Sequence, residues 1–211
     1  MTRLPFLGQT EASPFVKDCS HLFVGYPKTG KTELLTETVS DWSGLGIRTC
    51  YFTEEPEFIW DARLEMASGD FDGVELVFAL GGGYEAILSE ISASKADIVI
   101  IDTLRVLMMN DENDNSHINK VFTPLMAACR TSSKTLIISH HTRKGGGSGG
   151  EAASGGHAFL GLVDIGLELE RVGQPDNRRK IKGHGRIFGV QELLYERSDD
   201  GIFLLLGDPG Q

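Results

Sequence analysis

Hydrophobic positions follow two different patterns along the chain. Up to residue 141, short uninterrupted apolar runs alternate with longer amphipathic segments, whereas from residue 164 onward apolar and polar residues alternate one by one. Short apolar runs between turn residues are typical of strands buried on both faces, and apolar residues three and four apart indicate helices. The pattern therefore predicts alternating strands and helices, followed by a β-rich tail.

The predicted strands of the first part are 21–24, 47–53, 74–79, 98–101 and 135–139, and the predicted helices are 32–42, 57–67, 84–94 and about 116–131. The apolar positions of the second helix are Phe58, Ile59, Ala62, Leu64 and Met66. Further strands are predicted near 165–169, 178–182, 186–195 and 201–206. Alternating strands and helices form right-handed βαβ units, in which helices cover both faces of a parallel sheet. We therefore predict a three-layer α/β/α fold with a mainly parallel central sheet and antiparallel strands added at the C-terminal edge.

The length of 211 residues suits a single domain spanning residues 1–211. Within it, residues 1–18 form a lead-in, and the Gly-rich stretch 145–156 is predicted to be a mobile loop. The sequence has no apolar run of the ~20 residues that a membrane span needs and no signal-peptide pattern at its start. The three cysteines are widely spaced, which argues against a disulfide framework or a zinc site. We expect a cytoplasmic protein with no membrane partner.

A phosphate-binding motif organises the chain. Its sequence fits G-x-x-x-x-G-K-[ST] and comprises Gly25, Tyr26, Pro27, Lys28, Thr29, Gly30, Lys31 and Thr32. A predicted buried strand precedes it and a predicted helix follows it, so the helix N-terminus adds partial positive charge beneath the bound phosphates. Lys31 is then expected to reach the β- and γ-phosphates of ATP, and the Thr32 hydroxyl to ligate Mg²⁺.

A second candidate for the metal site is Asp102. Four apolar residues precede it, so a buried strand would deliver its carboxylate to the rim of the sheet. There it can hold Mg²⁺ together with Thr32. An N-cap of a following helix is the alternative for an isolated aspartate, but the phosphate-binding motif upstream favours the metal role.

Two adjacent glutamates, Glu54 and Glu55, follow the predicted strand 47–53 directly. A carboxylate at such a strand end can orient and deprotonate a water molecule for attack on the γ-phosphate. The alternative is an acidic turn that caps the next helix, which suits one of the two acids better than both. The sequence leaves open which of them is the base, although we assign it to Glu54.

His140 and His141 close the predicted strand 135–139, and Arg143 and Lys144 follow them. Polar side chains at this edge can sense the γ-phosphate and pass its state to the next loop. One of the histidines fits equally well in the core. A metal site formed with Asp102 is disfavoured, because no third ligand has suitable spacing.

The strongest basic cluster lies in the β-rich tail and comprises Arg178, Arg179, Lys180, Lys182 and Arg186. A charge run of this kind is usually a solvated strand face. The alternative is a set of cationic fingers that reach the nucleotide of a neighbouring subunit and stabilise charge on the transferring phosphoryl group.

Together these motifs resemble the RecA-like P-loop ATPase superfamily, and within it the RepA-type replicative helicase ATPases. The segments that carry the resemblance are GYPKTGKT (25–32), YFTEEP (51–56) with Arg63 nine residues after Glu54, IVIIDTL (98–104) before an acidic loop, IISHHTRK (137–144) and GGHAFLGLVDIGLELER (155–171). The resemblance implies a RecA-like fold.

By this resemblance Glu54 is the catalytic glutamate, Asp102 the Mg²⁺ acid and His141 the sensor that precedes a DNA-binding loop. Lys180 and Lys182 match the fingers that act across a subunit interface. The loop 144–154, with Arg143 and Lys144, is expected to face nucleic acid.

The implied function is that of a Mg²⁺-dependent ATPase that forms a homo-oligomeric ring or filament and acts on single-stranded DNA, as a helicase motor or as a recombination or replication accessory. Two features depart from this pattern: the loop 110–115 is acidic, and the loop 145–156 carries almost no positive charge. The net charge of −10 also argues against a nucleic-acid coat protein, although it leaves room for a local basic patch. The alternative is a nucleotide-gated switch of the KaiC sort that hydrolyses ATP slowly and does not translocate.

Overall fold

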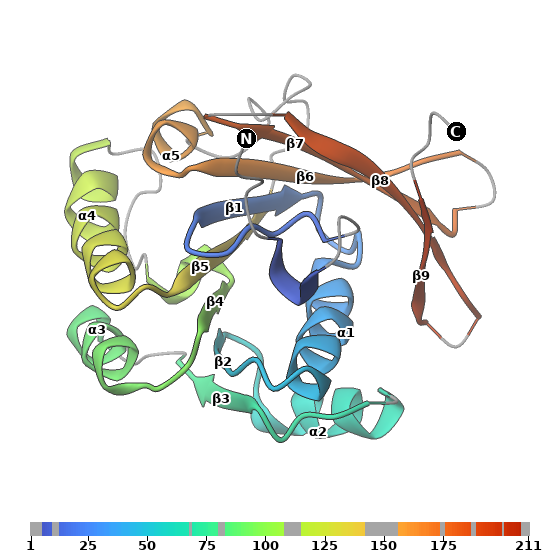
Figure 1. Ribbon diagram of the computed structural model, residues 1–211, viewed down its shortest axis with the longest axis horizontal. Helices are drawn as coiled ribbons and strands as arrows, with labels where there is room; N and C mark the ends of the chain where they lie inside the picture. The colour runs from blue at the N-terminus through green and yellow to red at the C-terminus, as the bar shows by residue number, and fades with distance from the viewer. Residues whose placement is uncertain are drawn as a thin grey trace.

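A nine-stranded sheet runs through the computed structural model, with the strand order β3-β2-β4-β5-β1-β6-β7-β8-β9 (Figure 1). The structure describes residues 6–9, 13–67, 69–79, 83–107, 115–141, 156–173, 176–186, 189–199 and 201–207. The strands are β1 (Ser20–Gly25), β2 (Thr49–Thr53), β3 (Val74–Phe78), β4 (Ile98–Asp102), β5 (Thr135–His141), β6 (Ile165–Arg171), β7 (Arg178–Gly185), β8 (Gly189–Arg197) and β9 (Phe203–Gly207).

The first six strands pair in parallel, and β6 to β9 pair antiparallel. This arrangement confirms the predicted fold class, including the antiparallel strands at the C-terminal edge. Because β1, β2, β4 and β5 are parallel neighbours, their carboxyl ends meet at one edge of the sheet. The phosphate-binding motif, Glu54, Asp102 and His141 are therefore brought to the same edge.

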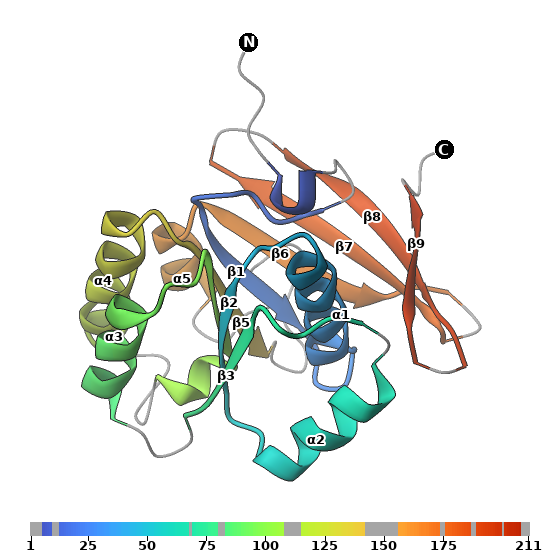
Figure 2. The same ribbon diagram turned by 60° about the horizontal axis from the view of Figure 1, so that its bottom comes forward.

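Helices cover both faces of the sheet (Figures 1 and 2). The described helices are α1 (Lys31–Gly44), α2 (Glu57–Met66), α3 (Tyr84–Ala93), α4 (Asn115–Thr131) and α5 (Gly156–Leu162), with 3₁₀ turns η1 (Leu7–Gln9) and η2 (Leu104–Val106). The helices α3, α4 and α5 share one hydrophobic core with the sheet, and α1 shares the other with β6 to β9. Alternate strand residues supply the two cores: Val99 and Ile101 face one, and Ile98 and Ile100 the other.

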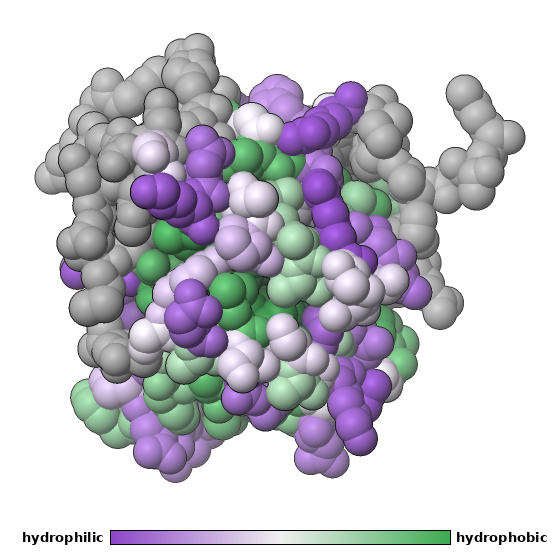
Figure 3. All heavy atoms as spheres, turned by 90° about the vertical axis from the view of Figure 1, so that its left-hand side faces the viewer, coloured by the Kyte–Doolittle hydropathy of each residue, from purple (hydrophilic) through white to green (hydrophobic). Residues whose placement is uncertain are grey.

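The outer side of α3 and α4 is a mixed surface, on which hydrophilic side chains lie around apolar ones (Figure 3). Both helices direct their buried residues, such as Ile87 and Phe122, toward the sheet. No helix among the described residues is long and apolar enough to cross a bilayer.

Two predicted features differ from the structure. The second predicted helix is confirmed as α2, but Trp60 is its buried residue, whereas Phe58 and Met66 are 68% and 75% exposed. Helix α5 was not predicted, because its seven residues adjoin a glycine-rich stretch that gives no periodic signal. Of the predicted mobile loop 145–156, all but Gly156 lies outside the described residues, as does the acidic loop 110–115 except for Asn115.

A buried histidine ties the lead-in segment to the sheet. The Val16 N–H donates to His21 Nε2 over 2.9 Å, and His21 Nδ1 lies 3.2 Å from the Leu136 carbonyl. Nδ1 therefore carries the ring proton, and a second proton on Nε2 would face the Val16 donor. Burial lowers the pKa of His21 to about 4, although its hydrogen bond to Leu136 acts in the opposite direction.

The free energy of unfolding should therefore fall as the pH falls from about 6.5 toward 4, because the unfolded chain binds the His21 proton first. Between pH 7 and pH 5 we expect a loss on the order of 2 kcal/mol from this group. Urea unfolding of wild type and His21→Gln at both pH values measures it, with the exposed His184→Gln as the control. Identical pH dependence in wild type and His21→Gln would contradict this assignment.

Candidate nucleotide-binding site

The phosphate-binding motif connects the end of β1 to the start of α1, as predicted. Gly30 caps α1 with φ of 98°, a conformation that favours glycine. It is also covered by β9, because a Cβ on Gly30 would lie 2.7 Å from Cζ of Phe203. The N-terminus of α1 therefore opens onto this edge of the sheet, where its unpaired N–H groups favour an anion.

Lys31 lies inside the loop and is only 4% exposed. Its Nζ donates to the Gly25 carbonyl and to His141 Nδ1, both over 3.0 Å. Burial lowers the pKa of Lys31 to about 8, with Asp102 and Glu33 acting in the opposite direction. The ammonium is therefore still charged at pH 7, at the point where a phosphate chain would enter the loop.

His141 is joined to this lysine and is neutral at pH 7. Burial, and after it the charge of Lys31, lower the pKa of His141 to about 4. Because an ammonium can only donate, His141 Nδ1 accepts, and the ring proton is on Nε2. This leaves an N–H donor beside Lys31, which suits the predicted role of a phosphate sensor.

Asp102 and Thr32 meet as predicted. The Thr32 hydroxyl donates to Asp102 Oδ2 over 2.8 Å, and the Tyr51 hydroxyl donates to the same oxygen over 2.7 Å. The other oxygen, Oδ1, is buried without a hydrogen-bond partner in the described part of the chain. A buried carboxylate oxygen without a donor suits a cation or its bound water.

The donor set fits Mg²⁺ in particular. No cluster of three or more His, Cys, Asp or Glu in the described ranges could hold a metal ion, so the protein offers Thr32 and Asp102. Mg²⁺ usually takes only one or two protein ligands and completes its octahedron with phosphate oxygens and water. Tyr51, which orients the carboxylate, was missed by the sequence analysis because a tyrosine in an apolar strand looks like a core residue.

Glu54 lies directly beyond β2, and its backbone N–H donates to the Asp102 carbonyl over 3.0 Å. Its carboxyl group is half-buried and is not part of an ion pair among the described residues. Burial raises the pKa of this carboxyl, while Arg105 and the hydroxyl of Thr103 act in the opposite direction. A carboxylate with a raised pKa beside the metal acid suits a general base.

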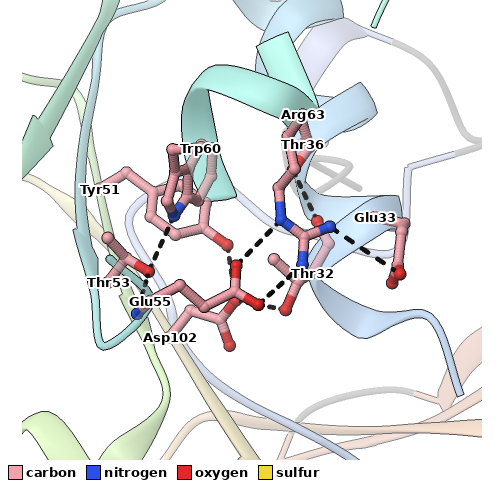
Figure 4. A network of polar contacts seen from close by, with 9 residues as sticks. All are labelled: Thr32, Glu33, Thr36, Tyr51, Thr53, Glu55, Trp60, Arg63 and Asp102. Carbon is pink, nitrogen blue, oxygen red and sulfur yellow. Dashed lines mark hydrogen bonds and ion pairs between the residues drawn. The ribbon is translucent and has the colours of Figure 1, made fainter. Parts of the chain in front are cut away.

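Glu55 has a different environment, in the network of Figure 4. Its two oxygens accept from Nε and Nη2 of Arg63 over 2.9 and 2.8 Å, and Arg63 Nη1 also lies 3.8 Å from Glu33. The ion pair ties the end of β2 to α2 and α1. The bidentate pairing occupies Glu55 and leaves Glu54 as the better candidate for the base.

The network rests on Thr53, the last residue of β2. Its hydroxyl oxygen accepts from Nε1 of the buried Trp60 over 2.9 Å and from the Glu55 N–H over 3.1 Å (Figure 4). Trp60 thus fixes the start of α2 against the strand end. This indole was not singled out in the sequence, although a tryptophan needs a partner for its N–H when buried.

Other predicted site residues lie elsewhere. His140 is buried and packs on Phe159, with ring centroids 5.7 Å apart, so it is the core histidine of the pair and is not next to Lys31. Its predicted role in cofactor binding is not supported by this position. Arg143 and Lys144 lie outside the described residues.

The basic cluster divides between the two faces of β7. Lys182 lies 2.7 Å from Glu170 and Lys180 lies 3.4 Å from Glu192, so both candidate fingers pair with glutamates of neighbouring strands. Arg179 points the other way and is buried, and Arg186 donates to the Val163 and Gly161 carbonyls beside α5. A solvated face is therefore the wrong description for Arg179.

A cavity of about 370 Å³ adjoins the site between α1, the end of α2 and the turn from β8 to β9. Its lining includes Glu33, Arg63 and Phe203. It therefore begins where the Arg63 network ends and lies beside the aromatic ring that covers Gly30.

The comparisons with known proteins agree with this geometry. A family model described as AAA domain (AAA_25) matches residues 15–147. A solved structure of a helicase ATPase domain matches with a TM-score of 0.70 at 16% identity, over 90% of this chain and 86% of that chain. In all, 657 solved chains match, so the fold alone does not select a substrate. No curated protein gives a significant match.

Proposed function

Because the chain belongs to the AAA domain family and has a RecA-like fold, confirming its resemblance to RecA-like P-loop ATPases of the replicative helicase type, we propose that it hydrolyses ATP with Mg²⁺. The observation that carries the proposal is the meeting of Lys31, Thr32, Asp102 and Glu54 at one edge of the sheet. A phosphate-binding lysine, a metal-binding pair and a half-buried carboxylate are the parts that phosphoryl transfer to water requires.

In this proposal the loop amides and Lys31 bind the β- and γ-phosphates, and the nearby cavity takes the base. Thr32 and Asp102 hold Mg²⁺, which when bound neutralises charge on the phosphate oxygens. Glu54 orients a water molecule and accepts its proton. The Nε2–H of His141 donates to the γ-phosphate and relates its presence to the segment that follows β5.

We further propose a homo-oligomeric ring or filament that acts on single-stranded DNA, with Arg143 and Lys144 on the DNA side. In this arrangement Lys180 and Lys182 would leave their glutamates and reach a neighbouring subunit's nucleotide. The support is the resemblance of the sequence motifs and the family.

A nucleotide-gated switch with slow hydrolysis is the second candidate function. It is favoured by the ion pairs of Lys180 and Lys182 within their own chain and by the net charge of −10. Fingers that stay paired would leave the transition-state charge with Lys31 alone.

One experiment separates the two functions. Phosphate release is measured over a range of protein concentrations, with and without single-stranded DNA, alongside the mass of the assembly. The motor predicts that specific activity rises with concentration and with DNA, and that mixing inactive Glu54→Gln with inactive Lys182→Ala restores activity. Slow release that depends on neither concentration nor DNA, with no recovery on mixing, would favour the switch.

A further inference from the structure

Two arginines from the C-terminal strands contact the back of the phosphate-binding loop. Arg179 of β7 is 4% exposed, and its Nε donates to the Thr29 carbonyl over 2.7 Å. Arg171 of β6 donates through Nη2 to the Lys28 carbonyl over 2.6 Å. Asp176 joins them, 2.6 Å from Arg171 Nη1 and 3.4 Å from Arg179 Nη1. We call Arg171, Asp176 and Arg179 the loop brace.

The brace fixes the direction of two peptide planes. In a planar trans peptide, the N–H of one residue points opposite to the carbonyl of the residue before it. Carbonyls of Lys28 and Thr29 that are held toward the arginines therefore turn the N–H groups of Thr29 and Gly30 toward the inside of the loop. There the Thr29 N–H meets the Tyr26 carbonyl over 3.2 Å, while the Gly30 N–H faces the space at the start of α1.

The loop also contains a strained residue. Lys28 has φ of 64°, in the left-handed region that side chains other than those of Gly, Asn and Asp rarely adopt. Such a conformation persists only where its surroundings hold it in place. The brace contacts the carbonyl of Lys28 and the carbonyl that follows it, so it acts on the peptide planes that this strain would otherwise release.

We propose that Arg171 and Arg179 are positioning residues for nucleotide binding, which keep the loop amides aimed at the phosphates from outside the loop. The inference rests on the proposed ATP site but concerns residues that do not touch the nucleotide. Charged donors suit this role, because a hydrogen bond from a guanidinium is about twice as strong as one between neutral groups.

Arg171→Ala is the main test, because the Arg171 side chain is 44% exposed and its removal leaves no buried cavity. We expect ADP and ATP to bind about tenfold more weakly, and the amides of residues 27–31 to exchange with deuterium about tenfold faster, at an unchanged melting temperature. The matched control is Arg48→Ala, which removes an arginine of 56% exposure that pairs with Asp97 away from the loop. The control should bind and exchange like wild type.

Arg179→Lys is the second variant, since it keeps the charge but cannot reproduce the planar guanidinium contacts. It should raise the KM for ATP more than it lowers kcat, because a mispositioned loop weakens phosphate binding. Wild-type exchange and wild-type affinity in a folded Arg171→Ala would overturn the proposal. Faster loop exchange in a protein whose wild type binds no nucleotide would uphold the brace and refute the proposed ATP site instead.

Discussion

Glu54→Gln is expected to lower ATP turnover by ~10²-fold or more while nucleotide binding is retained. The substitution removes the base but keeps the length and shape of the side chain. Glu54 lies next to the metal acid, since its N–H bonds the Asp102 carbonyl, and burial raises the pKa of its carboxyl. Single-turnover phosphate release and equilibrium titration with ATP measure the two effects separately.

Glu55→Gln is the matched control, because it makes the same change one residue away. Its oxygens pair with Arg63, so this variant should loosen α2 and the adjoining cavity but retain most of the turnover. If Glu55→Gln is the crippled variant and Glu54→Gln is active, the base has been assigned to the wrong glutamate. Full activity in both would refute the proposed site.

Lys31→Ala should weaken ATP binding by about 100-fold or more, which places it below detection in calorimetry. The Lys31 ammonium is the charged donor inside the loop, and losing two charge-assisted hydrogen bonds to phosphate oxygens corresponds to a change of this size. Because the pKa of Lys31 is about 8, the ammonium is present at pH 7.

Two controls separate this effect from misfolding and from long-range charge. Lys31→Met keeps most of the apolar volume of the buried chain and should lose binding equally. Lys17→Ala removes one exposed positive charge far from the loop in sequence and should bind ATP like wild type. Affinity close to that of wild type in Lys31→Ala would mean that the loop does not bind the phosphates.

The sequence was informative where chemistry and pattern coincide. The apolar run before Asp102 and the spacing of the phosphate-binding motif predicted strands and a loop, and parallel pairing brings Asp102 and Thr32 within 2.8 Å. His141 likewise lies beside Lys31 as expected. Only local sequence and the rule that parallel strands end at one edge were needed.

Other parts of the site depend on contacts between distant segments, which no local pattern reveals. Arg179 lies 150 residues from Thr29, whose carbonyl it contacts. The period of two along β7 separates Arg179 from Lys180 and Lys182, so the basic run could have been divided between two faces from the sequence. Nothing in the sequence marks Tyr51 as the partner of Asp102, because the two residues are 51 positions apart and meet only once β2 has paired with β4.

The central claim, that this chain is a Mg²⁺-dependent ATPase, is tested most directly by phosphate release from ATP by the purified protein at high concentration. The measurement compares wild type with Glu54→Gln, each with Mg²⁺ and with a chelator. We predict release by wild type that requires Mg²⁺ and is reduced ~10²-fold or more in Glu54→Gln. Wild-type release that does not exceed that of Glu54→Gln, or that is unaffected by the chelator, would contradict the account.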